Sequence, residues 1–315
     1  MDSFRLTKAS EEELKEYREK VIPLQNGIFS ALAPLGEAIY LTGGTALARF
    51  YYNHRISEDL DFFTRETDLR DVFPSVVSLL KEAGFEIEIV HQSPSFARLF
   101  ANGYKLELAT EFNHHGELIK TEHGIYVNNL EDIGANKITA WEDRAELRDV
   151  VDLYYITKDV PLQRLFEIAD RKRVPVAYEK FLAINTQGIQ GEVSLIGEIP
   201  EEELRAFVNK LVKAVNDNLK KKEEEAFREV DKYISRLLWD FPKKSRRISP
   251  DTIPILRRRI EKVSLPIRRA IERAIAQRGL PEETVRAVRE AREGKNVRGI
   301  TLEELKEIAG LRGKE

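Results

Sequence analysis

The spacing of apolar and polar residues in the first part of the chain changes several times between a helical and a strand period. Residues 39–41 form a short apolar run of the kind found in buried strands, and residues 59–63 alternate between acidic and apolar side chains. Successive side chains of a strand point to opposite faces, so Asp59 and Asp61 share one face while the residues beside them face a core. We expect both strands in a small sheet.

Helical spacing dominates two segments that flank these strands. Ser10 and the three glutamates after it form a capping-box pattern, which predicts a helix over residues 10–35 that bends or breaks at Pro23. Asp68 is placed to cap a second helix, which ends at Gly84. The front of the chain is therefore a mixed unit of helices and strands.

Four further strands are predicted before residue 130. Residues 85–89 alternate as a half-buried strand, and residues 125–128 form a short one. Residues 95–101 and 104–111 are two runs joined by Asn-Gly, a strong signal of a type I′ hairpin. From residue 130 onward almost every segment has helical spacing. We therefore predict an α+β fold, with a small mixed sheet followed by an all-helical C-terminal region.

Candidate chemistry gathers around the first two strands. Gly43 and Gly44 form a turn at the start of a helix, where a backbone without Cβ atoms lets a phosphate approach and the first N–H groups point at it. Asp59 and Asp61 repel each other unless cations lie between them, and carboxylates on one strand face suit Mg²⁺, which shares its ligand shell with substrate phosphates. Together these features predict a site for a nucleoside triphosphate.

A third carboxylate has two interpretations. The apolar residues of segment 104–108 share the core face, which leaves Lys105 and Glu107 on the other face. If this strand lies beside residues 59–63, Glu107 falls next to the two aspartates and completes a metal site. Otherwise Glu107 is an exposed side chain paired with Lys105. The spacing alone leaves both interpretations open.

Charged residues recur in the predicted helices that follow. Apolar residues between positions 133 and 154 have helical spacing, and Lys137 and Arg144 lie on a neighbouring stripe. Asp149 and Asp152 are i, i+3 neighbours on a helix, where one can serve chemistry while the other pairs with an arginine. Periodicity alone describes all of these charges as a solvated helix face.

Composition narrows the class of protein. The net charge of −3 is uneven, because residues 225–315 hold 23 Lys and Arg against 15 Asp and Glu, whereas residues 1–224 hold 28 against 39. Such asymmetry is typical of a basic arm that meets nucleic acid or an acidic partner. The absence of Cys excludes disulfides and thiolate metal sites. There is no leader pattern and no apolar run of about 18 residues, so we expect a cytoplasmic protein without membrane contact.

The basic residues concentrate in residues 243–278, which hold twelve Lys or Arg and almost no aromatic residues. This density matches contact with the backbone of a folded RNA, because each phosphate contact releases counterions, and it does not indicate base stacking. A basic helical bundle packed on the acidic front half explains it equally well, and residues 281–308 distantly resemble a small antitoxin tail that regulates or dimerises. The side chains assigned to RNA are Lys243, Lys244, Arg246, Arg247, Arg257, Arg258, Arg259, Arg268 and Arg269.

Several motifs resemble a known family. The order GGTALA, HRIS and DLDFF resembles the polymerase-β-type nucleotidyltransferases and, more closely, their AbiEii/AbiGii branch. KITAWEDR followed by RDVVDLYYI is similar to the third and fourth motifs of that branch, which comprises toxins of bacterial phage-defence toxin–antitoxin pairs. The resemblance covers residues 39–157, and the helices to about residue 224 fit its general plan.

The resemblance implies site residues, an acceptor and a partner. It implies that Lys137 contacts the triphosphate, that Asp149 or Asp152 completes the site, and that a third acid stands on a strand next to Asp59 and Asp61. It also implies that the acceptor is a hydroxyl at the 3′ end of tRNA, and that an antitoxin is the cognate partner.

The resulting hypothesis is transfer of a nucleoside monophosphate from an NTP to a hydroxyl. Two Mg²⁺ held by Asp59, Asp61 and Glu107 clamp the attacking and leaving oxygens at the α-phosphate. The pyrophosphate is held by backbone N–H groups, a hydroxyl and cations, from Gly43, Gly44, Thr45, Arg55 and Lys137. Ser57 is an alternative acceptor, a regulatory position or a loop cap.

Two alternatives and a domain organisation accompany this hypothesis. The fold can persist in a protein that binds nucleic acid or an antitoxin without turnover, or it can transfer NMP to a protein hydroxyl. The predicted organisation is a nucleotidyltransferase α/β core at residues 1–128, a helical domain completing the site at residues 129–224, and a basic helical extension at residues 225–315.

Overall fold

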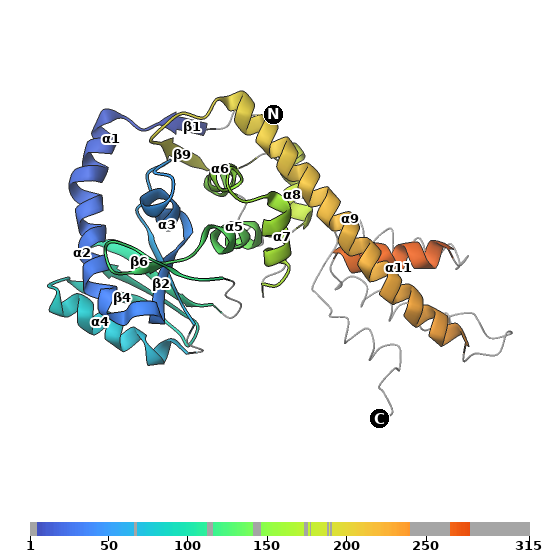
Figure 1. Cartoon of the computed structure of the whole chain (residues 1–315), viewed down its shortest axis with the longest axis horizontal. Helices are drawn as coiled ribbons and strands as arrows, with labels where there is room; N and C mark the ends of the chain where they lie inside the picture. Colours follow the sequence, from blue (N-terminus) through green and yellow to red (C-terminus); the bar gives the residue numbers. More distant parts are fainter. Residues whose placement is uncertain are drawn as a thin grey trace. The chain divides into compact units, whose positions relative to one another are not determined.

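A computed structural model gives the fold of the chain (Figure 1). The chain divides into two compact units, Met1–Ala214 and Val215–Glu315. Among the described residues, no helix combines the length and the apolar character needed to cross a bilayer. The structure describes residues 5–65, 68–111, 116–140, 146–172, 176, 178–187, 189, 191–239 and 265–277.

The first unit is built on a seven-stranded sheet with the order β4-β5-β6-β3-β2-β8-β7. Strand β3 runs parallel to β6 and β2 runs parallel to β8, while the other neighbours are antiparallel. The predicted α+β class with a mixed sheet is confirmed. The strands are β2 (Ile39–Thr42), β3 (Leu60–Thr64), β4 (Ile87–Gln92), β5 (Phe96–Ala101), β6 (Tyr104–Thr110), β7 (Ile119–Lys120) and β8 (Tyr126–Val127).

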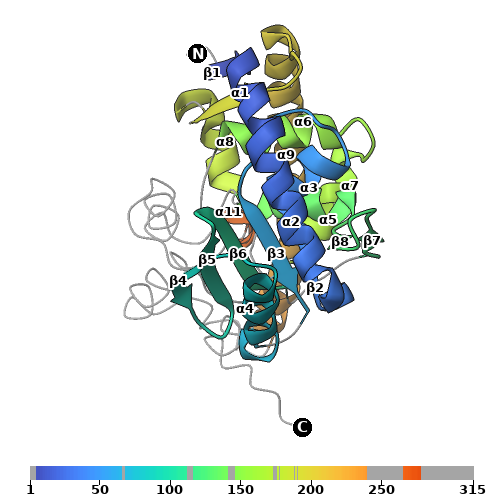
Figure 2. The same ribbon diagram turned by 90° about the vertical axis from the view of Figure 1, so that its left-hand side faces the viewer.

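One face of this sheet belongs to the core. Helices α2 (Ile22–Leu32) and α4 (Phe73–Glu82) cover it (Figure 2). Leu60 and Phe62 of β3 are each 1% exposed, as the alternation predicts. Asp61, which lies between them on the strand, therefore points to the opposite face of the sheet.

The hairpin of β5 and β6 positions the third carboxylate. Its turn residues Asn102 and Gly103 have φ values of 48° and 82°, and positive φ at both positions is what a type I′ turn requires. The hairpin prediction is confirmed. Because β6 pairs in parallel with β3, Glu107 lies directly beside Asp61 in the register.

The first predicted helix changes its hydrogen-bonding pattern next to Pro23. Ser10 forms the expected capping box at the start of α1 (Glu11–Glu16). The α-helical geometry then gives way to a π-helical turn at Tyr17–Val21, and α2 follows. Pro23 follows this turn directly, and its missing N–H cannot continue the pattern in which Ile22 N–H bonds to the carbonyl of Tyr17. The helical geometry is therefore distorted immediately before Pro23.

The strand predicted at residues 85–89 is present with shifted bounds. Strand β4 begins at Ile87, forms the edge of the sheet and is largely exposed, with Ile89 and Val90 at 47% and 52%. Its pairing with β5 shifts between Ile89 and His91, and such bulges are common on edge strands. Phe85 and Ile87 are half-buried while Glu86 and Glu88 are exposed, so the predicted alternation holds up to Glu88 and ends at Ile89.

The expectation of helices alone after residue 130 is wrong at one place. Strand β9 (Glu192–Leu195) pairs in parallel with β1 (Arg5–Lys8), the first described segment of the chain. The remaining elements are helical, and they are α5 (Leu130–Thr139), α6 (Leu147–Ile156), α7 (Leu162–Ala169), α8 (Tyr178–Gln187), α9 (Glu201–Trp239) and α11 (Leu265–Gln277).

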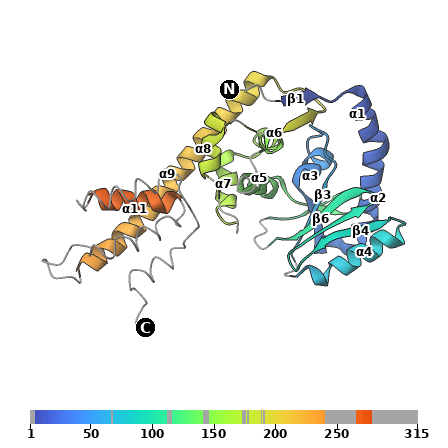
Figure 3. The ribbon, with the colours of Figure 1, turned by 180° about the vertical axis from the view of Figure 1, so that it is seen from behind.

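In the second unit, α11 lies against the second half of α9 (Figure 3). Arg268 is only 5% exposed, Arg269 pairs with Glu223 at 3.6 Å, and Arg273 pairs with Glu224. Arg268 is therefore buried and Arg269 pairs with an acidic residue of α9, and the assignment of both to RNA stays a prediction. Outside the described residues lie segment 281–308 and the other assigned cations, Lys243, Lys244, Arg246, Arg247, Arg257, Arg258 and Arg259.

Candidate active site

The turn between β2 and α3 (Gly43–Phe50) is packed against two charged side chains. Gly43 has a φ of +71°, and a Cβ built there would lie 2.7 Å from Oδ2 of Asp61. A Cβ on Gly44 would lie 2.0 Å from a guanidinium nitrogen of Arg55. A Cβ at either position would therefore displace the Asp61 carboxylate or the Arg55 guanidinium, and the positive φ of Gly43 by itself favours glycine.

Thr45 and Ser57 fasten the loop behind this turn. Thr45 Oγ1 lies 2.9 Å from Ser57 Oγ and donates to the backbone carbonyl of Asp59. Thr45 is 1% exposed and Ser57 is 8% exposed. The Thr45 hydroxyl, predicted to bind phosphate, is instead engaged inside the fold and holds the start of β3.

Three carboxylates lie at the edge of β3 and β6. In the strand register, Asp61 stands opposite Thr42 of β2 on one side and opposite Glu107 of β6 on the other. Asp59 immediately precedes β3, and its carboxylate is 2.8 Å from Lys105 Nζ. Lys105 is 3.9 Å from Glu107, which makes its closer ion pair with Arg98 at 2.6 Å. The register thus brings Glu107 to the aspartates, and Lys105 pairs mainly with Asp59.

Asp61 is the carboxylate of this group that most lacks a cation. It forms no ion pair within the described part of the chain, and burial, followed by the charge of Glu107, raises the pKa of Asp61. Lys137 opposes this shift from across the cleft. A buried carboxylate beside a second one fits a hard divalent ion such as Mg²⁺. The described residues nevertheless include no ready-made cluster of three His, Asp or Glu side chains around one point.

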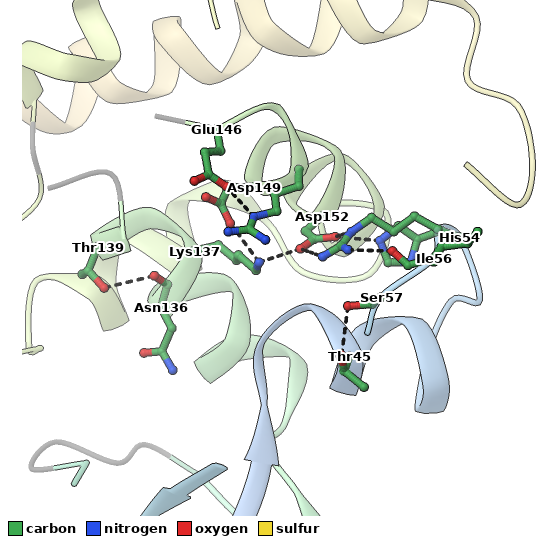
Figure 4. Close-up of polar contacts among 12 residues, drawn as sticks. Thr45, His54, Ile56, Ser57, Asn136, Lys137, Thr139, Glu146, Asp149 and Asp152 are labelled. Carbon is green, nitrogen blue, oxygen red and sulfur yellow. Dashed lines mark hydrogen bonds and ion pairs between the residues drawn. The ribbon is translucent and has the colours of Figure 1, made fainter. Parts of the chain in front are cut away.

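A buried ion cluster lies behind the glycine turn (Figure 4). Arg55 donates from Nε and a terminal nitrogen to the two oxygens of Asp152, at 2.7 and 2.8 Å. Lys137 Nζ lies 2.6 Å from Asp152 and 2.9 Å from Asp149. Helix α5 thus supplies the ammonium, α6 supplies both carboxylates, and the loop before β3 supplies the guanidinium.

These contacts fix the charges of the cluster. Burial opposes ionisation, yet Arg55 and Lys137 hold the pKa of Asp152 well below its usual value. Burial likewise disfavours the ammonium, but Asp149 and Asp152 raise the pKa of Lys137. Lys137 is 5% exposed and the two aspartates are fully buried, so the expectation of a solvated helix face is wrong for all three. Arg148 pairs with Glu146, and Arg144 lies outside the described residues.

The glycine turn, the carboxylates and the ammonium open onto one cleft of about 650 Å³. Thr45, Asp149 and Asp152 do not line this cleft and act behind it. The predicted site residues that the cleft brings together are Gly43, Gly44, Arg55, Ser57, Asp59, Asp61, Glu107 and Lys137.

A sequence model of the family described as "Nucleotidyl transferase AbiEii toxin, Type IV TA system" matches residues 28–242. The chain belongs to this family. The match includes every cleft residue named above, and the family assignment made from the motifs is confirmed. As an AbiEii-family member, the protein is a nucleotidyltransferase.

Individual proteins similar to this AbiEii-family chain are distant. An uncharacterised protein of Aquifex aeolicus is 28% identical over 151 residues, which span 46% of the chain and 66% of the relative. The structure of a putative nucleotidyltransferase from H. pylori has a TM-score of 0.45 at 22% identity, and the match covers 67% of the chain and 98% of that structure. MenT4, a nucleotidyltransferase toxin from Mycobacterium tuberculosis H37Rv, has a TM-score of 0.45 at 17% identity, with coverages of 62% and 83%.

Sequence reasoning gave no role to His54 and Arg98, which contact acidic residues of the AbiEii-family site. His54 Nε2 lies 2.7 Å from Asp152, and burial lowers the pKa of His54. Arg98 on β5 neutralises Glu107. His54 stands in the HRIS motif, so its place was visible, but its partner lies 98 residues away in the sequence. Arg98 could be found only from the hairpin register, which pairs it with Glu107.

Proposed function

We propose that the protein is a Mg²⁺-dependent nucleotidyltransferase that moves a nucleoside monophosphate from an NTP to a hydroxyl acceptor in this cleft. One observation carries the proposal: the register of β3 and β6 sets Glu107 beside Asp61, and the backbone of Gly43 packs against that same aspartate. A phosphate chain seated on the glycine turn would have its α-phosphorus within reach of both carboxylates.

The residues of the cleft divide into those that bind and those that position. The N–H groups at the start of α3 hold phosphate oxygens, with the positive end of the helix dipole behind them. Lys137 lines the cleft and supplies a cation, whose place is fixed by Asp149 and Asp152. Arg55 acts as a positioning residue, because Asp152 engages its guanidinium at two nitrogens.

In the reaction, the acceptor oxygen forms a bond to the α-phosphorus as the bond to the bridging oxygen of pyrophosphate breaks. The hydroxyl proton is released to solvent. Negative charge grows on the leaving pyrophosphate, and the glycine N–H groups and Lys137 stabilise it, since they are in place before the charge develops.

Asp59, Asp61 and Glu107 are the residues that would hold Mg²⁺. When bound, such ions supply positive charge to the attacking and leaving oxygens of the displacement. Lys105 and Arg98 already neutralise Asp59 and Glu107. Asp61 is thus the carboxylate whose charge a divalent ion relieves most.

For the acceptor we propose the 3′ end of tRNA, with the protein acting in the cytoplasm as the toxin of a type IV toxin–antitoxin or phage-defence system. The description of its family as a type IV toxin supports this role. The cations of residues 243–278 support an RNA acceptor, and a cognate antitoxin is the corresponding partner. The two alternatives are transfer to a protein hydroxyl and binding without turnover.

The test incubates the protein with each of the four NTPs labelled at the α-phosphate, total tRNA and Mg²⁺, and then separates RNA from protein. We expect label in RNA with the wild type and at least about a hundredfold less with Asp61→Asn. Label in the protein fraction would instead identify a protein hydroxyl as the acceptor. Equal labelling by both proteins, or by neither, would remove the enzymatic proposal.

A further inference from the structure

The sheet face that carries the carboxylates continues into an aromatic row. The register pairs Phe63 with Ala109 and Ala109 with Phe96, so these side chains lie side by side across β3, β6 and β5. The row is two residues along the strands from Asp61 and Glu107, and side chains two positions apart share a face. At roughly 3.3 Å per residue, it begins about 7 Å from the carboxylates.

This row places two aromatic residues on either side of a small one. Neighbouring strands lie about 4.8 Å apart, so the backbones that carry Phe63 and Phe96 are about 10 Å apart, with Ala109 between them in the register. The Phe63 ring meets Tyr40 edge-on at 6.3 Å, and Arg98 lies 5.6 Å from the centre of the Phe96 ring. All three residues of the row are half-buried and line the cleft. Their partial exposure leaves aromatic surface available to a ligand that enters beside the carboxylates.

An amide on the opposite wall provides a second, independent observation. Asn136 of α5 lines the same cleft, and its Nδ2 is buried without a hydrogen-bond partner among the residues that the structure describes. Figure 4 shows the amide extending away from Lys137 and Asp149. A buried amide donor is normally satisfied, so this one indicates the place of a ligand acceptor atom.

We propose that this part of the cleft is a nucleoside subsite, in which a base stacks on the Phe63–Ala109–Phe96 row and Asn136 donates to an oxygen of the same nucleoside. The inference rests on the proposed function, because the row adjoins the carboxylates at which NMP transfer would occur. Stacking accepts any base, whereas an amide distinguishes bases by their hydrogen-bonding edges. The base belongs either to the incoming NTP or to the end of the acceptor RNA.

The experiment measures affinity by calorimetry for the four NTPs and for tripolyphosphate, a probe without a base. We expect Phe96→Ala to lower the affinity for the preferred NTP at least about fivefold and to leave the affinity for tripolyphosphate unchanged. Phe96→Tyr should restore the affinity for the NTP. Asn136→Ala should bring the affinities for the four NTPs closer to one another. Phe100→Ala is the matched control, since Phe100 lies on the same strand face but does not line the cleft.

A base from the acceptor gives a different supporting result. The NTP affinity of Phe96→Ala is then unchanged, and its KM for total tRNA in the incorporation assay rises at least about fivefold. The subsite is overturned if Phe96→Ala changes neither quantity, or if Phe100→Ala causes the same loss. Failure of the proposed function gives a different result from failure of the subsite. In that case the wild type transfers no label, although it binds an NTP more tightly than tripolyphosphate.

Discussion

Asp61 is the residue at which stability and activity oppose each other. Its carboxylate is buried beside Glu107, and burial followed by that neighbouring charge raises its pKa. A carboxyl group whose pKa is raised by folding destabilises the native state once it is ionised in both states. At neutral pH the protein therefore carries a charge that its fold disfavours and its chemistry needs.

We expect Asp61→Asn to raise the Tm at neutral pH without divalent ions, while it abolishes transfer. The gain should shrink as the pH falls through the raised pKa, because the folded wild type then takes up a proton at Asp61. Added Mg²⁺ should raise the Tm of the wild type only. Scanning calorimetry checks this, and a variant that melts below wild type at neutral pH, or responds equally to Mg²⁺, would contradict it.

Asp152 has the opposite character, since its ionised form holds two buried cations. Asp152→Asn leaves Arg55 without the carboxylate that it binds and leaves Lys137 with Asp149 alone, and removing one partner of a buried pair typically costs about 3–5 kcal/mol of unfolding free energy. Urea titration measures the loss. Asp159→Asn is the control, because Asp159 is exposed and the contact shown for its carboxylate is a hydrogen bond from the Tyr52 hydroxyl. A loss no larger than that of the control would contradict the role of Asp152 in holding the two cations.

The pH dependence of that loss has a defined sign. The pKa of Asp152 is depressed in the fold, so its contribution to stability is present above its ordinary pKa and disappears as the pH falls through the depressed value. The difference between wild type and Asp152→Asn should therefore narrow in strong acid and stay constant near neutrality.

For individual residues, the sequence predicted the parts of the site whose members lie close together in the chain. A glycine pair followed by an acidic-x-acidic strand predicts the turn, the strand face shared by the two aspartates and the cleft from a single segment. The burial of Asp152 was not visible, because helical periodicity tells which residues share a side of a helix but not what packs there. Its partner Arg55 is 97 residues away.

Among the secondary-structure elements, β9 was missed although it supports the site. Its four residues are too few for a periodic signal, and its partner β1 is near the other end of the first unit. Ser194 accepts a hydrogen bond from Ile56 N–H at 3.0 Å, and Ile196 N–H donates to the carbonyl of His54 at 3.0 Å. The strand thus holds the backbone of the loop that presents Arg55 to Asp152.

Ile196→Pro tests this support, because proline removes the N–H that bonds to His54. We expect a loss of about 1 kcal/mol or more of unfolding free energy, with reduced NMP transfer. Ile196→Ala keeps the N–H and serves as the matched variant, with near wild-type transfer. Equal transfer rates in the proline and alanine variants would show that β9 does not position the loop.

Over the whole molecule, charge is the property that the sequence showed most directly. The front 224 residues are acidic and the remainder is basic, with 23 Lys and Arg against 15 Asp and Glu. The structure assigns two of those cations, Arg269 and Arg273, to pairs with α9. Tertiary packing decides which cations form ion pairs within the protein. Composition alone therefore could not tell these cations from those available to bind RNA.

Replacing Lys243, Lys244, Arg246 and Arg247 together by Ala should weaken binding to tRNA and leave NTP affinity unchanged. Each lost phosphate contact lowers the slope of log K against log salt by about 0.7–0.9, so four contacts change it by about 3. Filter binding over a salt series measures both quantities. An unchanged slope would assign these cations to something other than RNA phosphates.

The most direct measurement compares NTP labelled at the α-phosphate with NTP labelled at the γ-phosphate, under the same Mg²⁺ and tRNA conditions. We expect the α-label to enter the acceptor, the γ-label to leave as pyrophosphate, and both signals to vanish in Asp61→Asn. Transfer of the γ-label to the acceptor, or undiminished transfer of the α-label by Asp61→Asn, would contradict nucleotidyl transfer at this cleft.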